Sequence, residues 1–449
     1  MKNADIFSSD PRGRILVEAL EAGLDAVEPK AAMRRVLHGG ACVRVGERQY
    51  CPGPPVYVVG FGKASRGMAE AVVEILDVRV EGGFVIAPHG MGGKIGPILV
   101  AEGDHPVPGE KTLRSSMRLV EFLADIPPNS LLLVLISGGG SSLFEIPFEG
   151  LDFDEIRRTV HLLLASGADI FEINAVRKHL SRVKGGQLLR YTKAALIETI
   201  VISDVVGDDV STIASGPTVP DPTTFKDALE ALSKHNILNK VPQSVRKLLE
   251  KGAKGELPET PKPGDPIFHK TYVTIAARNR DALAAAAASL KAHGVEAVIL
   301  TDTLRGEARE AGKVLASLLE ALHRGISTHR GQQRAILAGG ETTVKVTGKG
   351  VGGRNQELCL SLALELHRLR LLSSYKAACM GTDGVDGSSP AAGAIVDETT
   401  IPVALGRGMN PWSYLANNDT YTFFYKLNTI IDTGGYTGTN VNDIFIALT

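Results

Sequence analysis

The sequence predicts an α/β fold built on parallel sheets. Apolar runs of strand length alternate with stretches of helical periodicity along nearly the whole chain, which is typical of this class. The run 131–136 (LLLVLI) is entirely apolar and predicts a strand buried on both faces, as in a parallel sheet. At 449 residues the chain exceeds one typical hydrophobic core, so we expect two or three domains.

Elements of the first half follow from apolar runs and from the 3.6-residue period. Two helices over 12–37 precede a short strand at 56–59, and a Gly-x-Gly turn separates that strand from a helix over 64–76. Further strands are predicted at 83–87 and 196–203, the second followed by a long polar loop. Amphipathic periodicity predicts the remaining helices over 152–166, 173–180, 225–235 and 241–251.

A proline-rich segment separates the two halves of the chain. Residues 252–270 contain four prolines and three glycines, which is typical of a linker or a surface excursion. We therefore predict domains at 1–250 and 251–449. Beyond the linker the alternation continues, with helices at 280–293, 307–323 and 354–366 and strands at 272–277, 295–300, 334–338, 343–346, 377–380, 393–396 and 444–447.

Composition excludes several classes of protein. The formal net charge of −1 gives no basic surface for nucleic acid. No run approaches the ~18 apolar residues of a membrane-spanning helix, and the N-terminus lacks a signal-peptide core. The four cysteines show no zinc-site spacing and no C-x-x-C pair, so we expect reduced thiols in a cytoplasmic protein.

The loop after the strand 131–136 is the strongest functional signal. It consists of three hydroxyl-bearing residues and three glycines: Ser137, Gly138, Gly139, Gly140, Ser141 and Ser142. Consecutive amides in such a turn form an anion-binding concavity, and glycine lets a ligand approach the backbone closely. At the carboxyl end of a parallel strand this chemistry suits phosphate, although a tight strand-to-helix turn has the same composition.

Lys63 lies between Gly62 and the predicted helix over 64–76. There its ammonium could reach a phosphate or a developing oxyanion, and a solvated surface lysine is the alternative. The surrounding GFGKAS partly matches a dinucleotide-binding fingerprint, but Ser65 replaces its third glycine and no acidic residue ends the next strand. The sequence therefore gives little support to NAD binding.

Two acidic loops follow predicted strands. Asp204, with Asp208 and Asp209 close behind, can place carboxylates at the sheet edge, where they suit Mg²⁺ unless they cap turns. Asp383 and Asp386 stand three apart around a glycine, directly after the strand 377–380. They predict a metal site or a site for substrate hydroxyls.

Among the basic residues other than Lys63, Arg354 is a functional candidate and the rest are expected to be structural. Arg354 begins the helix 354–366, against the preference of a helix N-terminus for acids, which an anionic ligand in its guanidinium fork would explain. The basic residues within 174–189 predict a solvated helix face. His105, in the stiff turn GDHPVP, is interpreted as structural.

These segments together resemble the glycerate 2-kinase family, the ATP-dependent D-glycerate kinases. The resemblance runs from about residue 10 to the C-terminus and rests on VVGFGKAS, GDHPVP, ISGGGSSL, NAVRKHLSRVKGGQL, ISDVVGDD, SGPTVPDP, GGETTV, GGRNQEL, GTDGVDGSSPAAGA and TGTNVND. It implies an N-terminal Rossmann-like parallel sheet, a C-terminal α/β MOFRL domain of about 330–449 with a mixed sheet, and an active site in the cleft between them.

The resemblance also implies a reaction. Phosphate would pass from ATP, with Mg²⁺, to the 2-hydroxyl of D-glycerate in a cytoplasmic enzyme that is expected to be a homodimer. The loop 137–142 would hold nucleotide phosphates, and Lys63 and Arg354 would stabilise the transferring charge or bind the glycerate carboxylate. Asp204 and Asp208 would bind magnesium.

The acidic loop of the second half would complete such a site. Asp383, Asp386 and Asn440 would lie near the glycerate hydroxyls or the metal, and one of the aspartates would accept the hydroxyl proton. The resemblance does not choose between the two aspartates.

Two other functions stay open. Some family members carry the name hydroxypyruvate reductase, an activity that would need NAD(P)H. A non-catalytic sugar-acid-binding protein would keep the site without turnover, but it would have little use for Lys63, Arg354 and two acidic loops.

Overall fold

The computed structural model describes residues 1–7, 10–324, 333–370 and 374–449. The chain divides into two compact units, residues 32–276 and residues 1–31 together with 277–449. This division differs from the boundary at 250 that the linker predicts. Strand β10 (Thr271–Ala277) extends the sheet of the first unit, and helix α2 (Pro11–Val27) packs against α11 (Asn279–Ala292) of the second.

A seven-stranded sheet forms the centre of the unit 32–276. Its order is β10-β9-β8-β4-β5-β7-β6, with β4 at Val56–Phe61, β5 at Val80–Pro88, β6 at Gly93–Ile95, β7 at Ile98–Gly103, β8 at Leu131–Ile136 and β9 at Leu196–Ile202. Strands β9, β8, β4, β5 and β7 run parallel, and β6 is antiparallel at one edge. Every residue of β8 is buried, so the predicted strand buried on both faces is confirmed.

Helices pack against this sheet and beside it. Helix α4 (Ser65–Leu76) contacts β4, β5 and β8, whereas α5 (Glu110–Ala124) contacts β5 and β7. A separate hydrophobic core joins α7 (Phe153–Ala165), α8 (Ile170–His179), α9 (Phe225–Lys234) and α10 (Gln243–Ala253). Capping boxes fix the starts of α7, α8 and α9, and α3 (Pro29–Val36) leads into the unit.

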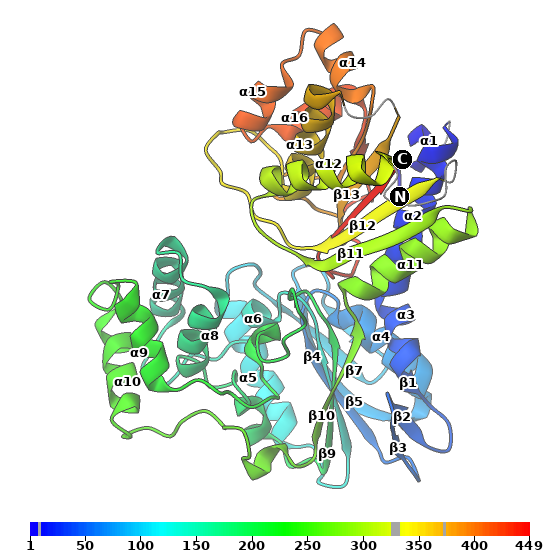
Figure 1. Ribbon diagram of the computed structural model, residues 1–449. Coiled ribbons are helices and arrows are strands. Elements are labelled where there is room, and N and C mark those ends of the chain that lie inside the picture. The colour runs from blue at the N-terminus through cyan, green and yellow to red at the C-terminus, as the bar shows by residue number, and fades with distance from the viewer. Residues whose placement is uncertain (8–9, 325–332, 371–373) are drawn as a thin grey trace. The chain divides into compact units, whose positions relative to one another are not determined.

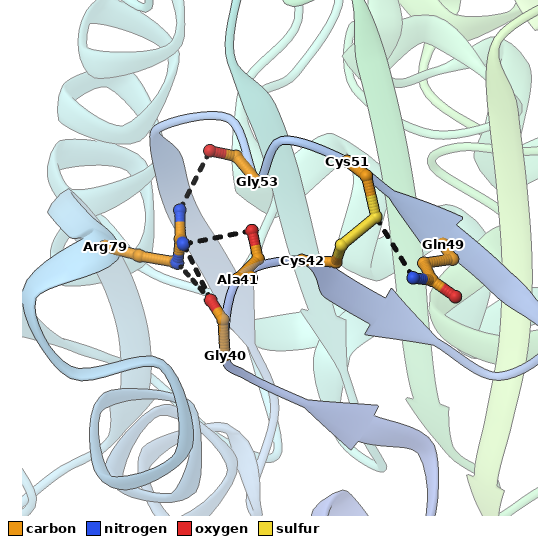
Figure 2. The surroundings of a disulfide bond; sticks show 7 residues. All are labelled: Gly40, Ala41, Cys42, Gln49, Cys51, Gly53 and Arg79. Carbon is orange, nitrogen blue, oxygen red and sulfur yellow. Dashed lines mark hydrogen bonds between the residues drawn. A yellow bond between two sulfur atoms is a disulfide. The ribbon is translucent and has the colours of Figure 1, made fainter.

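A small antiparallel sheet corrects the expectation of reduced thiols. In it β1 (Leu37–His38) pairs with β2 (Val43–Val45), and β2 pairs with β3 (Arg48–Tyr50). Because Val43 pairs with Tyr50, the register brings Cys42 opposite Cys51, and the two form a disulfide with a Cα–Cα distance of 4.7 Å (Figure 2). The guanidinium of Arg79 donates to the carbonyls of residues 40, 41 and 53 on either side of this disulfide.

A six-stranded mixed sheet forms the centre of the other unit. Its order is β11-β12-β16-β13-β14-β15, with β11 at Glu296–Leu304, β12 at Arg334–Gly340, β13 at Lys376–Gly381, β14 at Gly393–Asp397, β15 at Ile430–Ile431 and β16 at Asp443–Leu448. Strands β11 and β12 are parallel, and the remaining pairs are antiparallel. The mixed sheet that the resemblance implies is therefore confirmed.

Helices cover both faces of this mixed sheet (Figure 1). Helices α12 (Ala308–Arg324) and α13 (Arg354–Leu369) share one core with the sheet, and α2 and α11 pack on the other face. The sequence pattern does not predict the short helices α14 (Thr400–Gly406), α15 (Pro411–Ala416) and α16 (Thr420–Leu427), nor α1 (Ala4–Phe7).

The prediction of a strand at 343–346 is wrong. Only Thr343 forms an isolated bridge there, to Glu307. The segment that follows is held by a side chain instead of a sheet, because the amides of Thr347 and Gly348 both donate to Oδ1 of Asn418 at 2.8 Å. Among the described helices, none combines the length and the apolar character needed to cross a membrane.

Candidate active-site residues in the two units

The predicted phosphate loop lies at the switch point of the seven-stranded sheet. From β4 the chain continues to β5 and β7 on one side, and then returns to add β8 and β9 on the other. In open α/β sheets, ligands bind beyond the carboxyl ends of the strands where the order reverses in this way. Lys63 follows β4, Ser137 follows β8 and Asp204 follows β9, so the three sequence-predicted segments share that edge.

Hydrogen bonds hold the loops after β4 and β8 together. The amide of Lys63 donates to the carbonyl of Gly138 at 2.8 Å, and the amide of Ala64 donates to Oγ of Ser137 at 2.9 Å. A Cβ added to Gly62, whose φ is +131°, would lie 2.3 Å from the same Oγ. Ser137 is buried, and its hydroxyl is used in the contact between the two loops. It would therefore be occupied when a ligand binds.

The rest of the loop presents backbone donors. Gly139 adopts a left-handed φ of +78°, and its carbonyl accepts a hydrogen bond from Oγ of Ser142 at 2.9 Å. Within the described part of the chain, the amides of Gly138, Gly139 and Ser141 donate to no residue. This geometry is that of a concavity for an anion, because such amides attract negative charge.

Three side chains converge on the two central glycines. A Cβ added to Gly138 would lie 2.3 Å from Oδ2 of Asp204. A Cβ added to Gly139 would lie 2.8 Å from Nε2 of His105 and 3.3 Å from Cγ of Lys63. His105 was interpreted as structural, because its only signal in the sequence is an imidazole in a stiff turn.

The acidic loop after β9 contains two kinds of aspartate. The carboxylate of Asp209 accepts hydrogen bonds from the amide of Ser211 at 3.0 Å and from Oγ1 of Thr212 at 2.8 Å, so it caps a turn. Burial raises the pKa of Asp209, but these bonds outweigh burial and lower it. Asp208 lies in the preceding turn at a φ of +56°, and Asp204 lies against Gly138.

The described residues contain no cluster of three or more acidic, histidine or cysteine side chains that could hold a metal ion by themselves. Mg²⁺ commonly takes only one or two carboxylates and completes its shell with water and substrate phosphate oxygens. The carboxylate of Asp204 beside the open amides of the loop fits this mode of binding.

The basic residues of 174–189 do not form the predicted solvated face. Lys178 and Lys184 are buried, and Lys178 pairs with Asp221 at 3.2 Å. Nζ of Lys184 donates to the carbonyls of Ser141 and Phe144, each at 2.9 Å, and burial lowers its pKa to about 8. The prediction was wrong because this segment passes beneath the phosphate loop and supports it.

The second predicted cluster forms at one edge of the mixed sheet. Asp443, the first residue of β16, pairs with Gly340 at the end of β12 and with Gly381 at the end of β13. The acidic loop 382–388 follows β13, and Arg354 starts α13. Asp443 belongs to the segment TGTNVND of the family resemblance, but it was not among the predicted site residues.

Arg354 is held by carboxylates of the protein itself. Its Nε donates to Oδ2 of Asp443 at 2.6 Å, and its Nη2 donates to Oδ1 of the same residue at 3.1 Å. Nη1 donates to Oε1 of Glu341 at 3.1 Å. Burial opposes the charged form, but the carboxylate of Asp443 raises the pKa of Arg354 above its ordinary value.

Asp386 caps the helix that Arg354 begins. It is 1% exposed, and its two oxygens accept the amides of Asn355 at 3.0 Å and of Gln356 at 2.9 Å. Burial raises the pKa of Asp386 to about 7, against these backbone hydrogen bonds. These hydrogen bonds fix the position of Asp386 in the cluster, whereas its catalytic role stays a prediction.

Asp383 and Asn440 are half-buried in turns next to this cluster. Oδ1 of Asp383 accepts the amide of Val385 at 3.2 Å, and Oδ1 of Asn440 accepts the amide of Asn442 at 3.0 Å. The charge of Asp383 contributes to raising the pKa of Asp443, after the larger effect of burial. The two residues therefore lie beside this cluster, and their roles toward a substrate or a metal stay predictions.

Comparisons with known proteins identify the family of the chain. Residues 15–250 match the family model described as a domain of unknown function (DUF4147), and residues 334–443 match the MOFRL family. A glycerate 2-kinase of Pyrococcus horikoshii is 42% identical over 88% of this chain and 87% of its own length. A putative hydroxypyruvate reductase of Agrobacterium vitis is 38% identical over 96% of this chain and 93% of its own length.

A solved structure shows the same fold. The crystal structure of a glycerate kinase from Thermotoga maritima matches 97% of this chain and 98% of its own, with a TM-score of 0.83 and 37% identity. At this coverage the match includes both units. The chain belongs to the glycerate 2-kinase family, with a DUF4147 region followed by a MOFRL domain.

Proposed function

We propose that the protein is a glycerate 2-kinase that transfers the terminal phosphate of ATP to the 2-hydroxyl of D-glycerate. The observation that carries the proposal is the loop 137–142, whose open amides lie at the switch point beside Lys63 and Asp204. Phosphoryl transfer needs mainly positioning and neutralisation of charge, and these groups supply both. The names of the relatives at high coverage support the same activity.

The unit 32–276 would bind the nucleotide. The amides of Gly138, Gly139 and Ser141 would take phosphate oxygens, and Lys63 would stabilise charge on the transferring group. Asp204 and Asp208 would hold Mg²⁺, which neutralises negative charge on bridging phosphate oxygens when it is bound.

The other unit would bind the acceptor. Arg354 would interact with the glycerate carboxylate or with the transferring phosphoryl group. Asp383 and Asn440 would bind glycerate hydroxyls. Because the carboxylate of Asp386 is committed to the amides of α13, we propose Asp383 as the group that accepts the hydroxyl proton and Asp386 as its fixed neighbour.

A product assay tests the proposal directly. Purified protein is mixed with ATP and D-glycerate, with and without EDTA, while ADP release is followed by a coupled assay. Phosphorus NMR of the product then distinguishes phosphorylation at the 2-position from phosphorylation at the 3-position. We expect EDTA-sensitive turnover to 2-phosphoglycerate, and no turnover above background would leave only a binding protein.

The reductase name of one relative requires its own assay. The chain lacks the third glycine of the dinucleotide fingerprint at Ser65, and β5 ends in Ala87 and Pro88 with no acid for a ribose hydroxyl. We expect no oxidation of NADH or NADPH on addition of hydroxypyruvate. Robust oxidation in that assay would overturn the kinase proposal.

The cellular location and the oligomeric state of the enzyme are also part of the proposal. We propose that it acts on its small substrate in the cytoplasm and assembles as a homodimer. Size-exclusion chromatography with light scattering measures the oligomeric state.

A further inference from the structure

The site in the mixed-sheet unit contains a residue that none of the roles above uses. Asp443 contacts the guanidinium of Arg354 through two parallel hydrogen bonds, at 2.6 and 3.1 Å. Paired bonds of this kind match the planar fork of arginine to a carboxylate and fix the plane of the cation. A single bond would leave that plane free to rotate.

Asp443 is itself held in place by rigid structure. It is the first residue of β16, which pairs with β12 on one side and with β13 on the other. Its side chain is 12% exposed, and its Oδ1 also accepts Nδ2 of Asn355 at 2.9 Å. The same Nδ2 lies 3.2 Å from Oδ1 of Asp386, so one amide connects the two buried carboxylates.

The two edges of the guanidinium face different surroundings. Nε and Nη2 face the buried Asp443, whereas Nη1 donates to Glu341, whose side chain is 45% exposed. The inner edge is therefore fixed by a nearly buried partner at the start of an interior strand of the sheet. The outer edge contacts an exposed carboxylate that an incoming anion can replace.

We infer that Asp443 is a positioning residue that orients the outer edge of Arg354 toward the anionic group of the substrate. The inference rests on the proposed function, because it assigns to Arg354 the stabilisation of charge in phosphoryl transfer. A cation that is oriented before the reaction needs no reorganisation when charge develops. An arginine with four rotatable bonds and no such partner would lose much of this advantage.

Asn in place of Asp443 is the informative change. The carboxamide keeps the size of the side chain, but it presents an N–H₂ group to one of the two donors of Arg354. One of the paired bonds and the negative charge are then lost together. We expect Asp443→Asn to lower kcat about 10- to 100-fold, the usual range for a group that orients a functional side chain, with little change in the KM for ATP.

A double-mutant cycle separates positioning from a purely structural role. If Asp443 acts through Arg354, the change Asp443→Asn has little further effect in the Arg354→Ala background, about twofold or less. Asp397 provides the control, because it is a carboxylate of the same sheet that pairs with Lys376 at 3.6 Å. Asp397→Asn should leave kcat unchanged, and thermal unfolding is measured for every variant.

The outcomes distinguish this inference from the proposed function. Wild-type protein that does not phosphorylate D-glycerate refutes the function itself. An active wild type with an unaffected Asp443→Asn variant refutes the positioning role, as does an equal loss in both backgrounds. If Asp443→Asn does not fold, Asn355→Ala takes its place in the cycle, and an additive effect with Arg354→Ala overturns the inference.

Discussion

Adding one methyl group at Gly138 tests the geometry of the phosphate loop. In Gly138→Ala the new Cβ would lie 2.3 Å from Oδ2 of Asp204, whereas real Cβ atoms essentially never approach closer than 3.0 Å. The carboxylate or the loop must therefore move by at least 0.7 Å, because the two distances differ by that amount. A displacement of about 1 Å in an active site can cost about 100-fold in rate, or about 2.7 kcal/mol.

The assay is steady-state ADP release with D-glycerate, repeated over a range of Mg²⁺ concentrations. We expect kcat/KM to fall about 100-fold and the Mg²⁺ concentration for half-maximal rate to rise, because Asp204 is the carboxylate displaced. Gly406→Ala is the matched control, since its new Cβ meets no atom within 4 Å. Normal kinetics and normal Mg²⁺ dependence in Gly138→Ala would refute the placement of Asp204 against the loop.

Four further changes test other parts of the structure. Lys63→Ala should cost ~2–4 kcal/mol in kcat/KM in the ADP-release assay, as removal of an oriented cation does. Lys184→Met should destabilise the fold by about 3–5 kcal/mol in denaturant unfolding, because it leaves the buried carboxylate of Glu145 without its cation. Burial opposes ionisation of Glu259, but a hydrogen bond from His179 at 3.0 Å helps lower the pKa of Glu259 to about 2. The ionised carboxylate therefore stabilises the fold above pH 4.5, and this stabilisation is lost as the pH falls toward 2. Glu259→Gln should therefore flatten the decline of stability with falling pH in unfolding experiments. Cys42→Ser should lower the free energy of unfolding by up to about 3 kcal/mol, measured against the wild type with and without reductant.

Each of these expectations has an outcome that contradicts it. Lys254 is an exposed lysine at the end of α10, and an equal loss of activity in Lys254→Ala and Lys63→Ala would remove Lys63 from the site. Unchanged unfolding of Lys184→Met would show that its contacts beneath the loop contribute nothing to stability. Parallel acid curves for Glu259→Gln and the wild type would contradict the role of that carboxylate, and equal melting with and without reductant would contradict the disulfide.

Much of the fold could be predicted because its strands are strongly apolar and its helices strongly periodic. The strand 131–136, its glycine loop and the helix that starts at Arg354 occupy the expected positions. The strand at 343–346 was wrong because alternating residues also suit an extended loop, and the partner that holds it, Asn418, lies some 70 residues away. Local patterns do not report such distant partners.

The site was harder to predict than the fold for the same reason. Asp386 resembled a catalytic acid in the sequence, yet its oxygens cap a helix that begins 32 residues earlier in the chain, at Arg354. The anionic partner expected for Arg354 was sought among ligands, and the structure supplies it as Asp443. The disulfide required the register of a hairpin, which composition and spacing alone do not give.

The interior position of β16 makes the mixed sheet depend on a single strand. This strand lies between β12 and β13 in the interior of its sheet, and the amide of Thr449, directly after it, donates to the carbonyl of Arg334. Loss of this strand would expose the edges of two strands that are otherwise paired, which favours aggregation. Changes that weaken β16 should therefore harm the whole sheet, because strands on both sides pair with it.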